Sequence, residues 1–310
     1  MRDGPAPQDS RTIVPVIINA TSGGGHSRED FARLEKLFAD NGMAARIVPA
    51  RGAEIANAAR AAMRTHPRLV VAAGGDGTMS AVADAVRGTD TTLGVLPAGT
   101  LNHFAKDLGI PTELEAAVKV LANGRRVAID IGEVNGNTFL NNSSLGLYPD
   151  MVRDRTRQQR RFRRSKWTAM FWALLATVRR SPLLSLRLCV DGEHHDYRAP
   201  FVFIGNNKYT MEGFDIGTRE RLDCSQLSIY TTHRCTAAGL AGLALRALFG
   251  RLHQAEDFAA LTGQSLRVES TRRRLLVATD GEVTAMETPL EFRIVPRALH
   301  VIVPQAQEEK

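Results

Sequence analysis

The chain has few of the features that mark secreted, zinc-binding or membrane-spanning proteins. Its three cysteines, Cys189, Cys224 and Cys235, are odd in number and lack metal-ligand spacing, which favours reduced thiols over disulfides or a zinc site. The polar segment 1–11 offers no apolar core of a signal peptide. We therefore expect a cytoplasmic protein.

The commoner glycine-rich phosphate loops are also missing from the most prominent glycine cluster. This cluster has neither the lysine of Gly-x-x-x-x-Gly-Lys-Ser/Thr nor the spacing of Gly-x-Gly-x-x-Gly. Its residues are Gly74, Gly75, Asp76, Gly77 and Thr78. It follows the apolar run 69–73 and precedes a helical pattern that begins near Met79. Such a strand-to-helix turn points backbone N–H groups and the positive end of the helix dipole at a ligand, which predicts phosphate binding.

The excess of positive charge is concentrated in one segment of the chain. The chain carries 40 Lys and Arg against 33 Asp and Glu, a formal net charge of +7. Eight of the basic residues lie between Arg153 and Lys166, against the single Asp154, so the rest of the chain has 32 residues of each sign. The sequence therefore indicates that this one segment binds an anionic surface.

The first half alternates short apolar runs with helical stretches, the pattern of a parallel sheet covered by helices. The expected strands are 13–19, 46–49, 69–73 and 92–96, and the expected helices are 28–41, 53–63, 79–86 and 113–122. We assign residues 12–131 to an α/β nucleotide-binding domain with a parallel sheet. Ligands of such sheets bind at the carboxyl ends of the strands.

The second half changes to strands joined by turns such as Asn135-Gly136, which predicts an antiparallel β-sandwich domain over residues 132–304. The expected strands are 129–134, 138–142, 184–190, 197–205, 227–231, 265–269, 275–279 and 290–295. The apolar run 299–303 could close either domain, so the last strand could return to the first domain.

Three loops follow successive strands of the first half and should meet at one edge of its sheet. They are residues 19–25, the cluster at Gly74, and residues 97–102. Each offers backbone donors together with a hydroxyl or an amide, the groups that bind a triphosphate.

These loops, with residues 103–105 and 108–111, resemble the diacylglycerol kinase catalytic domain family, which includes lipid kinases and sphingosine kinases. The resemblance is strongest over residues 12–131. It implies an α/β domain followed by a β-sandwich, with ATP and Mg²⁺ in the cleft between them and a lipid hydroxyl as acceptor. On this resemblance, ATP is bound by Asn19, Ser22, Gly23, Gly24, Gly74, Gly75, Asp76, Gly77, Thr78, Thr100 and Asn102.

Phosphoryl transfer also needs a group that orients or deprotonates the attacking hydroxyl. The resemblance places the catalytic carboxylate in Asp280-Gly281-Glu282, with Asp280 as the base and Glu282 as its neighbour or a metal ligand. A second copy, Asp191-Gly192-Glu193, lies in an evident hairpin and is expected to be only a turn.

One metal position departs from the family. Members often carry Leu-Asp-Asp-Gly where a carboxylate helps to hold a structural Mg²⁺, but residues 222–225 read Leu-Asp-Cys-Ser. Cys224 is a poor ligand for a hard cation, so Asp223 is the remaining candidate there.

The basic segment continues into an apolar stretch. Arg153, Arg157, Arg160, Arg161 and Arg164 recur at helical spacing. The apolar stretch 167–178, which contains Trp167, is too short to cross a bilayer. The segment from Arg153 to Trp167 is typical of a surface that meets anionic headgroups, although a core helix with solvated arginines is the alternative. Nucleic acid is not expected, because no reader motif or run of stacking aromatics accompanies the charge.

The sequence as a whole predicts a peripherally membrane-associated, ATP-dependent lipid kinase that transfers the γ-phosphate of Mg-ATP to a hydroxyl of a diacylglycerol-like lipid. Two alternatives stay open. One is a soluble metabolite kinase of the NAD kinase type, and the other is a non-catalytic lipid or nucleotide sensor. The acceptor lipid and the oligomeric state, a homodimer included, are not specified by the sequence.

Overall fold

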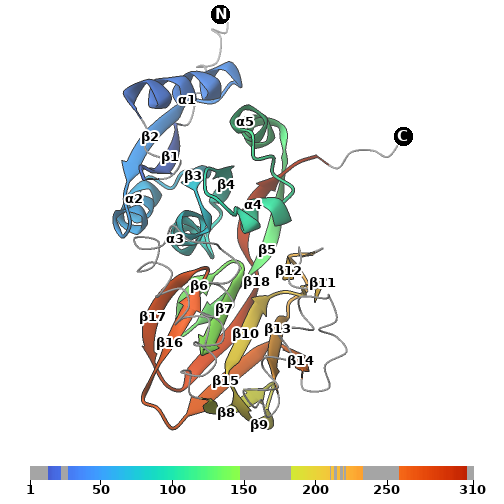
Figure 1. Ribbon diagram of the computed structural model, residues 1–310. Helices are drawn as coiled ribbons and strands as arrows, with labels where there is room; N and C mark the ends of the chain where they lie inside the picture. The colour runs from blue at the N-terminus through green and yellow to red at the C-terminus, as the bar shows by residue number, and fades with distance from the viewer. Residues whose placement is uncertain are drawn as a thin grey trace, which may run out of the picture. The chain divides into compact units, whose positions relative to one another are not determined.

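The computed structural model describes residues 13–21, 27–146, 183–209, 211–212, 215–216, 219, 221–232 and 258–305. The chain divides into two compact units (Figure 1). The first unit comprises Met1–Val127 with Leu299–Lys310, and the second comprises Ala128–Ala298. The chain therefore passes from one unit to the other twice.

The first unit is a parallel sheet with helices. Its strands are β1 (Val14–Asn19), β2 (Ala45–Ala50), β3 (Leu69–Gly74), β4 (Thr92–Pro97) and the last residues of β18 (Leu290–Val303). They lie in the order β2-β1-β3-β4-β18, and each neighbouring pair is parallel. The helices are α1 (Arg28–Asp40), α2 (Glu54–Met63), α3 (Asp76–Val86), α4 (His103–Asp107) and α5 (Leu114–Asn123). The predicted α/β architecture is confirmed.

Local sequence explains these elements. The central strands are continuous apolar runs because a parallel sheet is buried on both faces; Val16, Ile17 and Val71 are fully buried. Helix α1 begins at a capping box, in which Ser27 and Asp30 satisfy each other's backbone N–H groups. Each strand of the β1–β3–β4 group ends where a loop turns toward the next helix, which sets the strand ends at one edge.

The second unit contains two antiparallel sheets. One includes β5 (Arg125–Val134), β6 (Asn137–Phe139), β8 (Leu184–Val190), β9 (Glu193–Ala199), β15 (Ser265–Ser270) and the first part of β18. The other has the order β14 (Phe258–Gly263), β13 (Leu227–Thr232), β10 (Phe201–Asn206), β7 (Asn142–Gly146), β16 (Arg274–Thr279) and β17 (Glu282–Glu287). The short strands β11 (Met211–Glu212) and β12 (Asp215–Ile216) form a separate pair.

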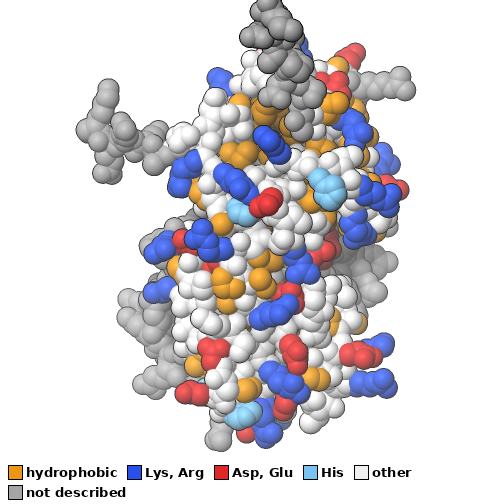
Figure 2. All heavy atoms as spheres, turned by 180° about the vertical axis from the view of Figure 1, so that it is seen from behind, with side chains coloured by type: hydrophobic (Ala, Val, Ile, Leu, Met, Phe, Trp, Pro, Cys, Tyr) orange, Lys and Arg blue, Asp and Glu red, His pale blue; other side chains and the backbone are white. Residues whose placement is uncertain are grey.

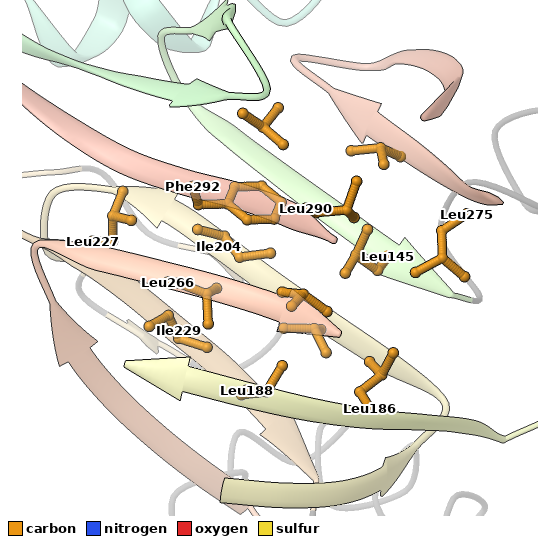
Figure 3. Close-up of a cluster of buried hydrophobic side chains, with 14 of the residues drawn as sticks. Leu145, Leu186, Leu188, Ile204, Leu227, Ile229, Leu266, Leu275, Leu290 and Phe292 are labelled. Atoms are coloured by element: carbon orange, nitrogen blue, oxygen red, sulfur yellow. The ribbon is translucent and has the colours of Figure 1, made fainter. Parts of the chain in front are cut away.

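One hydrophobic core joins the two sheets of the second unit (Figure 3). Leu188 and Leu266 of the first sheet contribute to the same buried cluster as Leu145 and Ile204 of the second. Phe292 of β18 meets Phe139 edge to face, with ring centroids 6.4 Å apart. Two sheets around one apolar layer form a β-sandwich, as the sequence predicted.

Strand β18 serves both units. Its first residues pair with β15, and His300 and Val301 pair with β4. Between these parts Arg297 has a positive φ of 51°, and its N–H donates to the Asp130 carboxylate at 2.9 Å. The apolar run at 299–303 thus belongs to the sheet of the first unit.

Several predicted elements differ from the structure in their bounds. Helix α3 starts at Asp76, three residues before the predicted start. The predicted strand 197–205 is broken at Pro200, which has no N–H for a ladder, into β9 and β10. The predicted strand 138–142 is divided into β6 and β7. Among the described residues no helix is long and apolar enough to cross a membrane. The basic segment from Arg153 to Trp167 lies outside the described residues.

Candidate active site

The start of α3 is the clearest ligand-binding feature of the first unit. Its N-cap is Gly75, in extended conformation, and no side chain caps the helix. The first turn of an α-helix leaves its N–H groups without partners in the helix, and α1 satisfies its own with the Ser27 capping box. Helix α3 has no such side-chain cap, and the amino end of a helix favours an anion.

The loops after β3 and β4 touch through their backbones. A Cβ built on Gly99 would lie 2.4 Å from the Cα of Gly75, so this approach requires glycine. A Cβ on Gly74 would lie 2.4 Å from the Thr78 hydroxyl. The side chain of Asn19, at the end of β1, donates to the same hydroxyl at 3.5 Å. The three strand ends therefore come together as the sequence predicted for this edge.

Asp76 ties these loops to each other. Its carboxylate accepts hydrogen bonds from the N–H groups of His103 at 3.3 Å and Phe104 at 3.0 Å. It thereby caps the short helix α4, whose own N-cap residue, Asn102, makes no capping hydrogen bond. The aspartate of the glycine cluster thus holds the position of the loop that contains Thr100.

The remaining predicted nucleotide-binding residues fall into two groups. Asn102 is buried, has a positive φ of 51°, and bonds the N–H and C=O of Gly99 through its side chain, so it fixes the loop. Thr100 is exposed. Ser22, Gly23 and Gly24 lie outside the described residues.

The acidic turn of the second unit joins β16 to β17. Asp280 has a φ of 47° and Gly281 a φ of 87°, the left-handed pair of a two-residue hairpin. The Asp280 carboxylate accepts from the N–H groups of Leu140 at 2.7 Å, Asn141 at 2.8 Å and Asn142 at 3.1 Å. Glu282 is exposed at the start of β17.

A buried polar network supports the chain that donates to Asp280, and sequence reasoning missed it. Arg219 is 3% exposed, and its guanidinium donates to the Leu140 carbonyl at 2.6 Å, the Asn206 carbonyl at 3.0 Å and the Asn141 side-chain oxygen at 2.9 Å. The Asn206 amide also donates to the Leu140 carbonyl at 2.8 Å. The asparagine pairs at 141–142 and 206–207 were the available signal, because polar doublets at the ends of apolar strands indicate buried hydrogen bonding.

The carboxylate at the candidate metal position is paired with an arginine. The Asp223 carboxylate accepts from the Arg221 side chain at 2.9 Å, and this hydrogen bond lowers the pKa of Asp223 below its ordinary value. The N–H of Cys224 donates to the Asn207 side chain at 2.9 Å. Within the described ranges no group of three His, Cys, Asp or Glu residues could hold a metal ion.

Family models match both halves of the chain. Residues 14–134 match the diacylglycerol kinase catalytic domain, and residues 148–303 match the YegS C-terminal NAD kinase beta sandwich-like domain.

Similar proteins support the same grouping. The chain is 29% identical to a diacylglycerol kinase of Bacillus subtilis over 95% of this chain and 97% of that protein. It is also 27% identical to an uncharacterized protein of Synechocystis. That match covers 76% of this chain but only 55% of the longer Synechocystis protein. A crystal structure of a putative diacylglycerol kinase from Bacillus anthracis has the same fold, with a TM-score of 0.73 at 19% identity over 96% of this chain and 99% of that one.

The uncapped start of α3, the convergent strand ends and the sandwich unit agree with these matches. The chain belongs to the family in which a diacylglycerol kinase catalytic domain precedes a YegS C-terminal NAD kinase beta sandwich-like domain, a family of phosphotransferases of the lipid kinase type.

Proposed function

We propose that the protein is an ATP-dependent lipid kinase that transfers the γ-phosphate of Mg-ATP to a hydroxyl of a diacylglycerol-like lipid. The observation that carries this proposal is the uncapped amino end of α3 at Gly75, where the ends of three parallel strands meet. Backbone N–H groups and the helix dipole favour a polyphosphate at such an edge. The family membership supports a lipid as acceptor.

In the proposed reaction the first unit binds the nucleotide. The N–H groups of Asp76 and Gly77 donate hydrogen bonds to phosphate oxygens, and the exposed Thr100 hydroxyl is a further donor. Asp76 maintains the geometry by capping α4, and Asn102 by bridging Gly99. Mg²⁺ enters as the counter-ion of ATP and neutralises phosphate charge.

The acidic turn of the second unit supplies the carboxylate for the acceptor hydroxyl. It contains two acids, Asp280 and Glu282, on the hairpin between β16 and β17. A carboxylate that accepts the hydroxyl proton typically contributes a factor of about 10²–10⁴ to the rate.

The basic segment is proposed to bring the enzyme to an anionic membrane surface. Each arginine near such a surface contributes about 1 kcal/mol of attraction. Elsewhere the charges are mixed: on the face shown in Figure 2, Lys and Arg side chains are interspersed with Asp and Glu. Arg267, for example, contacts both Glu269 and Glu291. The excess positive charge therefore lies with the segment from Arg153 to Lys166.

A transfer assay tests the catalytic proposal. Labelled ATP is incubated with vesicles of phosphatidylglycerol that carry diacylglycerol, a monoacylglycerol or a sphingoid base, with NAD as a soluble acceptor. We expect label in one lipid and none in NAD. Label in NAD would instead establish the soluble metabolite kinase, and ATP binding without transfer to any acceptor would establish a sensor.

A vesicle-binding assay tests the membrane proposal. We expect the triple change Arg160→Gln, Arg161→Gln and Arg164→Gln to weaken sedimentation with phosphatidylglycerol vesicles at low salt. The matched control changes Arg272, Arg273 and Arg274 to Gln, which removes the same charge from a described part of the second unit, at the start of β16. Equal binding of both triple variants and the parent would contradict the proposal.

A further inference from the structure

The loop after β2 lies at the proposed phosphate-binding edge of the first unit. Strands β2, β1 and β3 are neighbours in the sheet and run parallel (Figure 1). The register pairs Asn19 with Ala50, and the N–H of Ala20 donates to the Ala50 carbonyl at 3.0 Å. Arg51, the next residue along the chain, therefore follows β2 at the edge where Asn19 bonds Thr78 in the first turn of α3.

Cationic side chains are scarce where β1, β2, β3 and β4 end. The described residues that end these strands and begin the following loops are 19–21, 50–53, 74–78 and 97–102. Arg51 is the one lysine or arginine among them. A loop of the Gly-x-x-x-x-Gly-Lys-Ser/Thr type reaches the phosphates with its own lysine, which the cluster at Gly74 lacks. A neighbouring loop can supply that charge instead.

The backbone of Arg51 is held in place, whereas its charge is unused. Its N–H donates to the Glu54 carboxylate at 3.2 Å, and its carbonyl accepts from the Glu54 N–H at 2.9 Å, where α2 begins. Gly52, with a φ of 48°, makes the turn between them. The Arg51 side chain is exposed, and its guanidinium makes no hydrogen bond or ion pair with the described residues.

The acids closest to this edge are engaged with backbone N–H groups. The Glu54 carboxylate accepts from Arg51, and the Asp76 carboxylate accepts from His103 and Phe104 at the start of α4. Neighbouring strands lie about 4.8 Å apart, so the end of β2 is about 10 Å from the end of β3 across β1. A long side chain at the end of β2 can therefore meet a ligand that lies over β1 and the start of α3.

We propose that Arg51 binds the polyphosphate of the nucleotide and supplies the cationic side chain that the cluster at Gly74 lacks; this inference rests on the proposed function. A guanidinium is always charged, and its planar fork of N–H donors matches two phosphate oxygens. The other common contact of an arginine with a nucleotide is stacking on the base, and the choice of ligands in the test separates the two.

Displacement of a fluorescent ATP analogue from the full-length protein, with MgCl₂ present, tests the assignment. The competing ligands are ATP, ADP and inorganic tripolyphosphate, which has no base. We expect Arg51→Met to raise the Kd of all three by roughly tenfold or more, because it removes charge-assisted hydrogen bonds to phosphate. A higher salt concentration should narrow the difference between the parent and the variant.

Two further variants sharpen the result. Arg46→Met removes the same charge from an exposed position near the other end of β2, and it should keep each Kd within about twofold of the parent. Arg51→Lys keeps the charge but not the fork, so it should recover part of the affinity lost in Arg51→Met. All three variants should melt at the temperature of the parent, because both arginines are exposed.

Three results would overturn the assignment. The first is an unchanged Kd for ATP in Arg51→Met. The second is weaker binding of ATP with unchanged binding of tripolyphosphate, which would put Arg51 on the base. The third is an equal loss in Arg46→Met, which would reduce the effect to the overall charge of the protein. If the parent itself binds no ATP, the proposed function fails first, and this inference fails with it.

Discussion

The Asp191 turn and the Asp280 turn have the same tripeptide and the same backbone but different surroundings. The N–H groups that donate hydrogen bonds to Asp191 lie at the exposed start of β15. The N–H groups that donate hydrogen bonds to Asp280 lie in residues 140–142. The Leu140 carbonyl and the Asn141 side chain of this segment accept hydrogen bonds from the buried Arg219 and Asn206. A short motif can therefore specify a turn while the residues beneath it specify how rigidly that turn is held.

The largest expected difference between the turns comes from this buried layer. We expect Arg219→Ala to lower the free energy of unfolding by roughly 3–4 kcal/mol, because it leaves buried oxygens of Leu140, Asn206 and Asn141 without this donor. Urea unfolding followed by circular dichroism measures the loss. A change below about 1 kcal/mol would mean that the Asp280 turn is held no more firmly than the Asp191 turn.

The two glycines should behave alike, because the backbones are alike. A Cβ at Gly192 or at Gly281 would meet no atom within 4 Å, so only the positive φ opposes alanine. We expect Gly192→Ala and Gly281→Ala to cost about 1 kcal/mol each, within a few tenths of one another. If urea unfolding shows clearly different losses of stability for the two variants, the two hairpins differ in their own conformation.

The smallest expected effect is the acid sensitivity of the Asp191 turn. Burial disfavours its charge, but the N–H groups of Gln264 and Ser265 and the Ser265 hydroxyl outweigh that, so the pKa of Asp191 lies below its ordinary value of 3.8. A lowered pKa in the folded state gives stability that is present above the unfolded pKa and is lost as the pH falls through the folded one. The contribution should be below about 1 kcal/mol, because Asp191 is exposed.

Comparison of the parent with Asp191→Asn checks this effect. Between about pH 5 and pH 2, the range over which such a contribution is lost, the free energy of unfolding should fall more for the parent than for the variant. Parallel pH curves for the two proteins would show that these hydrogen bonds do not favour the charged form.

The parts of the fold that could be predicted have local signals. Strands β1, β3 and β4 are mainly apolar runs, and the hairpins at Asn135 and Asp191 carry an Asn-Gly and an Asp-Gly pair. Helix α4 was missed because five residues are too few to show a helical period. Strand β17 was missed because it is mostly exposed and carries little apolar alternation.

Only part of the candidate site could be predicted from the sequence. The convergence of the loops at Asn19, Gly75 and Gly99 follows from the strand-end rule and could be predicted. The network around Arg219 could not, because its hydrogen bonds join residues as far apart as Arg219 and Leu140, 79 positions along the chain, and buried polar residues have no periodic pattern. The structural task of Asp280 likewise depends on partners about 140 positions away.

The central claim is that nucleotide phosphates bind the uncapped start of α3. A crystal structure of the full chain with a non-hydrolysable ATP analogue and Mg²⁺ tests it most directly. We expect phosphate oxygens within about 3.2 Å of the backbone nitrogens of Asp76 or Gly77. Phosphates bound elsewhere, with the start of α3 left to solvent, would contradict it.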